Sequence, residues 1–330
     1  MPRMIAYAGI DEAGYGPLMG PLCVACSVWV IEDEEKPHEP PNLWRALSNA
    51  VCKSPRDRRG RIAITDSKRL KGANDGPRHP LTHLERGVHA TLGTIHAGSE
   101  PASTDSHLFA QLMVPPLDQH APWYAGAHTA PVANDAQRLA LLRAMLSRAC
   151  ERSRARPTSL QCAAVDAREI NTAASIGAAK SSVSWSLVMG HARAAKLAHW
   201  EVPLRIAIDR QGGRVRYRED LMREFDGARL SVLNESPEES IYALEGLGAP
   251  FTISFSVEAE SKHLPVALAS MTAKYTRELW MRRLNRWFAG RVDGLAPTAG
   301  YVEDGRRFLA SVRGTLVADE LEEALLVRAI

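Results

Sequence analysis

Carboxylate side chains follow several apolar segments of this chain, at spacings that could support metal-ion chemistry. Asp11 ends AYAGID and is followed at once by Glu12, Asp209 ends LRIAID, and Glu260 ends FTISFSVEAE. In an α/β sheet, groups beyond the carboxyl ends of strands gather at one edge, so these acids are expected to converge. Converging carboxylates repel each other unless a cation neutralises them. The pattern therefore predicts a site for a hard divalent cation such as Mg²⁺.

Two such ions can activate an attacking water and stabilise the leaving oxygen in phosphodiester hydrolysis. A competing interpretation holds for any single position, because an Asp after a strand is also a common helix cap. We interpret Asp66, before SKRL, and Asp166, before AREIN, as caps. Asp11 and Glu12 differ, because two adjacent acids in a glycine-rich turn make a poor cap and a good metal site.

The elements that would position these acids alternate between strands and helices. Apolar runs predict strands at 4–10, 22–31, 61–65, 160–165, 204–208, 230–233, 240–244 and 251–257. Periodic or charged segments predict helices at 43–51, 135–155, 181–200, 217–225, 261–291, 303–313 and 318–329. This order favours an α/β fold with a mixed central sheet flanked by helices. Residues 72–135 show little periodicity, and the sequence assigns no structure or role to this insert.

Bulk composition excludes some classes of protein. Hydrophobic residues make up 45% of the 330 and charged residues 24%, which is a globular composition. A net charge of +3 permits a nucleic-acid partner without arguing for one. The apolar run 18–31 is too short to span a bilayer. Five cysteines without a secretory signal favour a reducing, cytoplasmic setting, and the CxxC of Cys23 and Cys26 is interpreted as core packing.

Four motifs resemble those of the type 2 ribonucleases H, the ribonucleases HII and HIII. AGIDEAGYGPLMGPLCVA resembles the opening signature of the family, and TDSKRL resembles its Asp-Ser-Lys-x-Leu segment. ESKHLPVALASMTAKYTRE resembles its helix with Ala-Ser-x-x-Ala-Lys-x-x-Arg-Asp, and PTAGYVEDGRRF is similar to its late Gly-Tyr segment. The motifs keep the family's order and span residues 6–308, although residues 72–155 have no counterpart.

The resemblance implies an endonuclease that cuts the RNA strand of RNA/DNA hybrids with Mg²⁺ or Mn²⁺. The products would carry 5′-phosphate and 3′-hydroxyl ends. The family's four metal-binding and catalytic carboxylates correspond to Asp11, Glu12, Asp209 and Glu260. The fourth is assigned by its place ten residues before Ser270, which leaves Glu258 as the alternative. A Glu at this place is typical of ribonucleases HIII, and an Asp is typical of ribonucleases HII.

The resemblance also implies a substrate-binding set. Its loop would sense the 2′-hydroxyl of RNA through the backbone, its Ser, Lys and Arg side chains would hold backbone phosphates, and its Tyr would stack on a sugar. Outside the resemblance, charges such as Lys274 and Arg277 are more often a solvated helix face, and a Tyr after Gly is more often packing. The set is Gly14, Tyr15, Gly16, Ser67, Lys68, Ser270, Lys274, Arg277 and Tyr301.

The chain matches neither subtype fully. It has Gly14-Tyr15-Gly16 where ribonucleases HII have Gly-Arg-Gly, and we expect no N-terminal substrate-binding domain of the HIII kind. We expect one ribonuclease H-like catalytic domain over residues 1–330, with the insert at 72–135 and a C-terminal helical extension at 290–330. A monomer that binds hybrid nucleic acid and no membrane is expected. The alternatives are a nuclease of the same fold acting on DNA or junctions, and a non-catalytic hybrid-binding protein.

Overall fold

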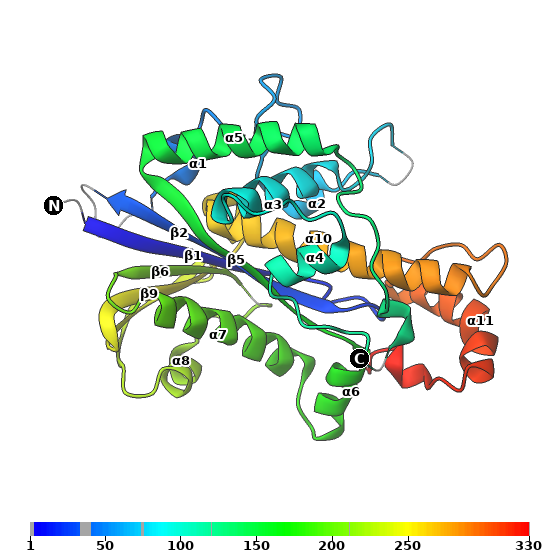
Figure 1. The fold of residues 1–330 in the computed structure, drawn as a ribbon. Helices are drawn as coiled ribbons and strands as arrows, with labels where there is room; N and C mark the ends of the chain where they lie inside the picture. The colour runs from blue at the N-terminus through cyan, green and yellow to red at the C-terminus, as the bar shows by residue number, and fades with distance from the viewer. Residues whose placement is uncertain (1–2, 34–40, 74–75, 120, 211, 330) are drawn as a thin grey trace.

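The computed structural model describes residues 3–33, 41–73, 76–119, 121–210 and 212–329. A seven-stranded sheet at its centre has the order β5-β2-β1-β6-β9-β8-β7 (Figure 1). β1 pairs in parallel with β6 and β6 with β9, whereas the remaining pairs are antiparallel. The seven strands are β1 (Arg3–Ala13), β2 (Leu22–Asp33), β5 (Ala155–Val165), β6 (Leu204–Asp209), β7 (Arg229–Glu235), β8 (Glu239–Gly246) and β9 (Gly248–Ser256). A second, two-stranded sheet joins β3 (Val51–Cys52) to β4 (Ile62–Ala63).

Helices cover both faces of the large sheet (Figure 1). One face carries α3 (Thr82–Ile95), α5 (Ala136–Ser153) and the long α10 (Leu264–Ala289), and the other carries α7 (Lys180–Ala198) and α8 (Arg218–Glu224). The remaining helices are α1 (Leu43–Ala46), α2 (Ser67–Leu70), α4 (Asp105–Gln111), η1 (Pro122–Tyr124), α6 (Ala167–Ser175), α9 (Ala259–Lys262), α11 (Val302–Ala318) and η2 (Glu323–Leu325). The expected α/β class, with a mixed sheet flanked by helices, is confirmed.

Alternation along the central strands divides most of the core between two large clusters. Tyr7 of β1 and Trp29 of β2 join the cluster beneath α10, whereas Ala8 and Val28 face the cluster beneath α7. This is the period of two that a sheet with both faces covered requires. No helix in the described part of the chain is long and apolar enough to cross a membrane.

A glycine in β1 sets the position of α10. A Cβ at Gly9 would lie 2.1 Å from the backbone nitrogen of Val266, so only glycine lets the start of α10 cross the strand this closely. The close crossing brings the first turns of α10 beside the end of β1, where Asp11 and Glu12 lie. The fold thus uses Gly9 to place a helix against the strand that carries the first acids.

The segment 72–135, which shows little periodicity in sequence, contains the helix α3 and the shorter helix α4. Helix α3 has 14 residues, contacts both α10 and α5, and has no exposed residue. Its Glu85 is fully buried and accepts hydrogen bonds from the Val132 and Ala133 backbone N–H groups and from Tyr275 Oη. In a surface helix, polar side chains such as this one would face water. In α3 the Glu85 carboxylate binds protein groups instead, and hydrophobic periodicity in the sequence does not indicate such a buried acid.

The prediction of a helix at 318–329 was wrong, because α11 ends at Ala318. The following residues instead form the short η2 and then an extended segment in which Val327 pairs with Met19. The expected helix at 43–51 is split in the same way, since α1 ends at Ala46 and β3 begins at Val51. In both segments, backbone pairing with another part of the chain determines the secondary structure. The local sequence does not indicate this pairing.

Candidate active site

A cavity of about 270 Å³ opens where β1 and β6 end. Every residue of the expected site lines it except Arg277, and the lining residues come from five separate stretches of the sequence. Those of the expected set are Asp11, Glu12, Gly14, Tyr15, Gly16, Ser67, Lys68, Asp209, Glu260, Ser270, Lys274 and Tyr301. Asp66 lines it as well, and its side chain accepts a hydrogen bond from the Lys68 backbone N–H at 2.8 Å, as the helix-cap interpretation predicted.

Strand register brings the acids together. Ile10 of β1 pairs with Ile208 of β6, so the next residues, Asp11 and Asp209, leave neighbouring strands at the same level. Asp209 pairs in turn with Ser256 at the end of β9, and α9 follows directly with Glu260. Parallel pairing of β1, β6 and β9 therefore places three carboxylates at one edge of the sheet.

Asp11 is buried close to the carboxylates of Asp209 and Glu260. Burial raises the pKa of Asp11 well above its ordinary value, and the charges of Asp209 and Glu260 raise it further. The Ser270 hydroxyl and the Glu12 backbone N–H, 2.7 Å from Asp11 Oδ1, act in the opposite direction. Repulsion between neighbouring acids is what a cation would relieve.

Asp209 lies in a similar environment. Burial raises its pKa to about 7, and Glu260 contributes to the increase. The Ala259 backbone N–H, which donates to Asp209 Oδ1 at 3.0 Å, and the charge of Lys68 lower it. A carboxyl with this pKa is partly protonated at neutral pH unless a cation is bound beside it.

Glu12 is held from the opposite face of the sheet. The hydroxyl of Ser184, a buried residue of α7, donates a hydrogen bond to Glu12 Oε2. Sequence reasoning missed Ser184 because a serine inside a helix carries no motif. Its only signal is a place on the same helical face as the buried Val188. The contact fixes the direction of one carboxylate of the expected metal site.

Glu260 and Glu258 differ sharply in their surroundings. Glu258 is exposed, has a left-handed backbone with φ of +53°, and does not line the cavity. Glu260 lines the cavity, and its Oε2 atom is buried without a hydrogen-bond partner among the described residues. A buried carboxylate oxygen with no donor is costly unless a ligand satisfies it. The geometry therefore favours Glu260 as the fourth acid.

The donor set suits Mg²⁺ or Mn²⁺, because these ions prefer carboxylate oxygens and need no Cys or His. The unpartnered Glu260 oxygen and the raised pKa values of Asp11 and Asp209 fit a cation in the cavity. In the part of the chain that the structure describes, no group of three or more His, Cys, Asp or Glu side chains forms a ready-made metal site. The acids are therefore close neighbours whose oxygens do not surround a single point.

Polar and aromatic groups surround the acids. Ser270 Oγ donates to Ser67 Oγ at 3.0 Å, which links α10 to α2 beside Asp11. Lys274 Nζ lies 3.1 Å from a carboxylate oxygen of Glu278, one helical turn further along α10. The Tyr301 ring is 53% exposed and is available to stack against a ligand.

Arg277 is placed differently from the expectation. It is 1% exposed, and its Nη2 donates to the Met19 carbonyl at 3.2 Å and the Ala299 carbonyl at 3.0 Å. It lies behind the glycine-rich loop, so it does not line the cavity where a phosphate would bind. The solvated helix face weighed for this side chain is wrong as well, because it is buried.

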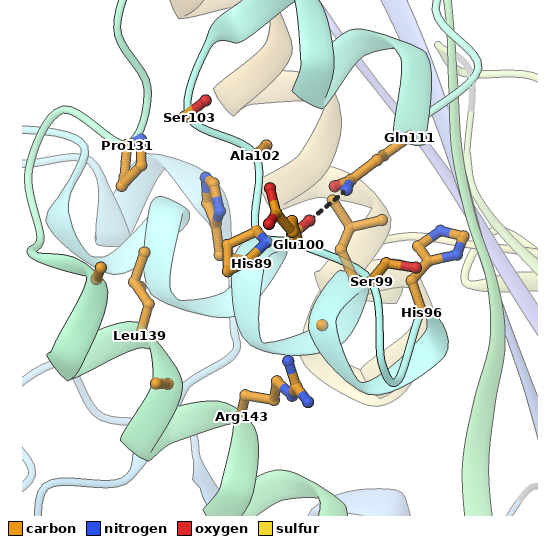
Figure 2. A pocket seen from close by; sticks show the side chains of 15 residues that line it. His89, His96, Ser99, Glu100, Ala102, Ser103, Gln111, Pro131, Leu139 and Arg143 are labelled. Atoms are coloured by element: carbon orange, nitrogen blue, oxygen red, sulfur yellow. Dashed lines mark hydrogen bonds between the residues drawn. The ribbon is translucent and has the colours of Figure 1, made fainter.

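A second cavity, of about 310 Å³, lies between α3 and α5 (Figure 2). His89, Glu100 and Arg143 lie around it, and it shares no lining residue with the acid-lined cavity. Burial lowers the pKa of His89 to about 4, so the ring is neutral at physiological pH. This cavity has no cluster of carboxylates and is not a candidate for metal-dependent hydrolysis.

We expect the metal-free protein to lose stability as pH rises from about 4 to about 7. The pKa of Asp209 is about 7 in the folded state against an ordinary 3.8, so folding favours its protonated form. That contribution is complete below the unfolded pKa and is lost as pH rises through the folded pKa. Its size is at most about 4 kcal/mol. Urea denaturation in EDTA at pH 4 and pH 8 measures it, and a smaller difference in Asp209→Asn would attribute it to this residue.

No family model matches the chain, and no curated protein matches it in sequence. Among solved structures, it is similar to ribonuclease HII of Archaeoglobus fulgidus, solved in a complex with PCNA, at 14% identity and a TM-score of 0.41 over 98% of this chain and 93% of that one. Ribonuclease H2 of Pyrococcus horikoshii OT3 gives 16% identity and 0.44 over 97% and 92%. Bst-RNase HIII in complex with Mn²⁺ gives 13% and 0.39 over 99% and 67%.

Proposed function

We propose that this chain is a divalent-metal-dependent endonuclease that hydrolyses the RNA strand of RNA/DNA hybrids and leaves 5′-phosphate and 3′-hydroxyl ends. The observation that carries the proposal is the meeting of Asp11, Glu12, Asp209 and Glu260 in one cavity beside a glycine-rich loop. A protein that only binds nucleic acid would have no use for carboxylates that repel each other and the substrate phosphates. Hydrolysis is the function that accounts for their cost.

The four carboxylates would hold Mg²⁺ or Mn²⁺, and Ser184 would keep Glu12 directed toward the site. Two bound ions would lower the pKa of the attacking water and stabilise the leaving 3′-oxygen. Lys68 is exposed at the rim, where its charge can attract a backbone phosphate. Ser67 and Ser270 form a hydroxyl pair that supports Asp11. Lys274 lines the cavity and forms an ion pair with Glu278.

Selection of RNA would rest on the loop from Gly14 to Gly16. Gly14 has φ of +88°, a conformation that favours glycine. A side chain at Gly16 would meet no atom within 4 Å, so this end of the loop is open. Backbone groups that reach a substrate closely can detect the 2′-hydroxyl, by which proteins distinguish RNA from DNA. Tyr15 and Tyr301 also line the cavity and are partly exposed.

We also propose that residues 1–330 form one catalytic domain that acts as a monomer. Leu84 and Val88 of the 72–135 segment share a core cluster with Met271 and Tyr275 of α10, the helix that carries Ser270 and Lys274. A segment that fills the core beneath the site is a part of the domain. It is less suited to be a separate docking element.

Cleavage of matched RNA/DNA, RNA/RNA and DNA/DNA duplexes tests the function. We expect only the RNA strand of the hybrid to be cut, and only with Mg²⁺ or Mn²⁺ present. Thermal denaturation with added Mn²⁺ is a second readout, since a cation that binds the folded state alone raises Tm. Cutting of DNA/DNA or of branched DNA would support the alternative nuclease. No cutting of any duplex together with an unchanged Tm would refute the enzyme.

The subtype is a separate question with its own substrate. A duplex with one embedded ribonucleotide is compared with a duplex that carries a long RNA tract. Cutting of both would match ribonuclease HII behaviour, and cutting of the tract alone would match ribonuclease HIII. The Glu at position 260 is the feature that favours the second result.

A further inference from the structure

The loop of residues 14–21, between β1 and β2, is held from behind by a buried arginine far away in the sequence. Arg328 is 2% exposed and follows η2. Its Nη1 donates to the Gly14 carbonyl at 2.5 Å and to the Pro17 carbonyl at 3.3 Å, and its Nη2 donates to the Gly20 carbonyl. One guanidinium thus binds the beginning, middle and end of the loop. Its fork of fixed donors suits this task better than a Lys ammonium would.

A second buried arginine lies beside the first. Arg277 of α10 donates to the carbonyls of Met19 and Ala299, and a Cβ at Gly14 would lie 2.6 Å from the Arg277 Cδ and Nε atoms. The pKa of Arg328 is lowered to about 10 by its burial and by the nearby charge of Arg277. Neither side chain forms an ion pair with a carboxylate within the described ranges. Two adjacent buried cations are a cost to folding, which a functional requirement would explain.

Peptide geometry connects Arg328 to the cavity. In a planar trans peptide, the carbonyl and the N–H of the next residue point in opposite directions. The Gly14 carbonyl points to Arg328, so the Tyr15 N–H points away from it. Gly14, Tyr15 and Gly16 all line the acid-lined cavity. The Tyr15 N–H donates to no other group in the described part of the chain, which leaves it available to a ligand.

The segment around Arg328 is itself fixed to the loop and to α6. Val327 pairs with Met19, and the Arg328 backbone N–H donates to the Leu18 carbonyl at 3.0 Å. Asn171 of α6 donates to the Ala324 and Val327 carbonyls, both at 2.8 Å. These contacts hold the guanidinium in place, and they offer a second, milder way to disturb it.

We propose that Arg328 is a positioning residue for RNA recognition, which it achieves by orienting the Gly14–Tyr15 peptide so that the loop's N–H groups face the substrate's 2′-hydroxyl. The proposal rests on the hybrid-cleaving function above. Arg328 does not contact the substrate, and it acts only by holding the loop backbone in place. Loss of the guanidinium fork therefore reduces the preference for RNA-containing duplex more than it reduces the catalytic step.

Steady-state kinetics of Arg328→Lys test this with a hybrid substrate and a DNA/DNA duplex as competitive inhibitor. We expect KM for the hybrid to rise about tenfold, kcat to change by less than about threefold, and the Ki of the DNA duplex to stay the same. Asn171→Ala is expected to raise KM about threefold in the same way. Hydrogen exchange of the amides at 15–20 should become faster in both variants.

Arg283→Lys is the matched control. Arg283 is also a buried arginine of α10, but it pairs with Asp105 at 2.6 Å and makes no contact with the loop. We expect it to lower Tm without changing the ratio of KM to Ki. A wild-type ratio in a folded Arg328→Lys overturns the proposal, and if that variant does not fold, a wild-type ratio in Asn171→Ala overturns it. A wild-type enzyme that shows no hybrid cleavage or preference refutes the proposed function itself.

Discussion

Asp11→Asn is expected to reduce hybrid cleavage at least about a thousandfold and to make the metal-free protein more stable. The amide has nearly the shape of the carboxylate, so the packing around β1 should persist. Its lack of charge would weaken the proposed metal site. It also removes the repulsion from Asp209 and Glu260 that raises the pKa of Asp11. The same substitution therefore moves activity and stability in opposite directions.

Single-turnover cleavage with Mn²⁺ and urea denaturation in EDTA at pH 8 measure the two effects. Asp166→Asn is the control, because Asp166 is a buried strand-end acid that caps α6 and lies outside the cavity. Asn caps helices about as well as Asp, so its activity should stay within about threefold of wild type. Near wild-type cleavage by Asp11→Asn would contradict the site assignment. Lower stability of Asp11→Asn in EDTA would contradict the account of mutual repulsion.

The acids could be predicted from sequence because strand ends are local features. An apolar run that ends in Asp marks the edge of the sheet, and parallel pairing then brings Asp11 and Asp209 to the same level. The cap interpretation of Asp166 succeeded for the same reason, since its capping box with Glu169 lies within four residues. A pattern whose interacting residues lie within a few positions of each other can therefore be interpreted from the sequence alone.

Residues whose role depends on distant partners could not be predicted. Arg277 has the spacing of a surface residue on α10, but it is buried because the loop from β1 closes over it. Arg328 and Ser184 carry no motif, and their partners lie more than 150 positions away in the sequence. From sequence alone, a charged residue is expected to face water. Arg277, Arg328 and Ser184 instead form hydrogen bonds with groups that only the folded chain brings close to them.

The comparison of two glutamates offers the sharpest test of the site. Glu260→Gln is expected to lower cleavage about a hundredfold, whereas Glu258→Gln should stay within about threefold of wild type. The two lie two residues apart and undergo the same chemical change, so differences in composition or net charge cannot explain a divergent result. Of the two, only Glu260 lines the cavity, and its Oε2 atom is buried without a hydrogen-bond partner among the described residues.

Metal titration followed by Tm separates binding from chemistry in this pair. Stabilisation by Mn²⁺ should weaken in Glu260→Gln and remain in Glu258→Gln, because a neutral amide is a poorer ligand for a hard cation. The reverse order of effects would assign the fourth acid to Glu258, and α9 would then have to turn in the metal-bound state. An equal loss of stabilisation by Mn²⁺ in both variants would mean that the total negative charge of this segment matters, and that neither glutamate alone is the ligand. Glu258 is exposed and lies outside the cavity, which argues for the first outcome.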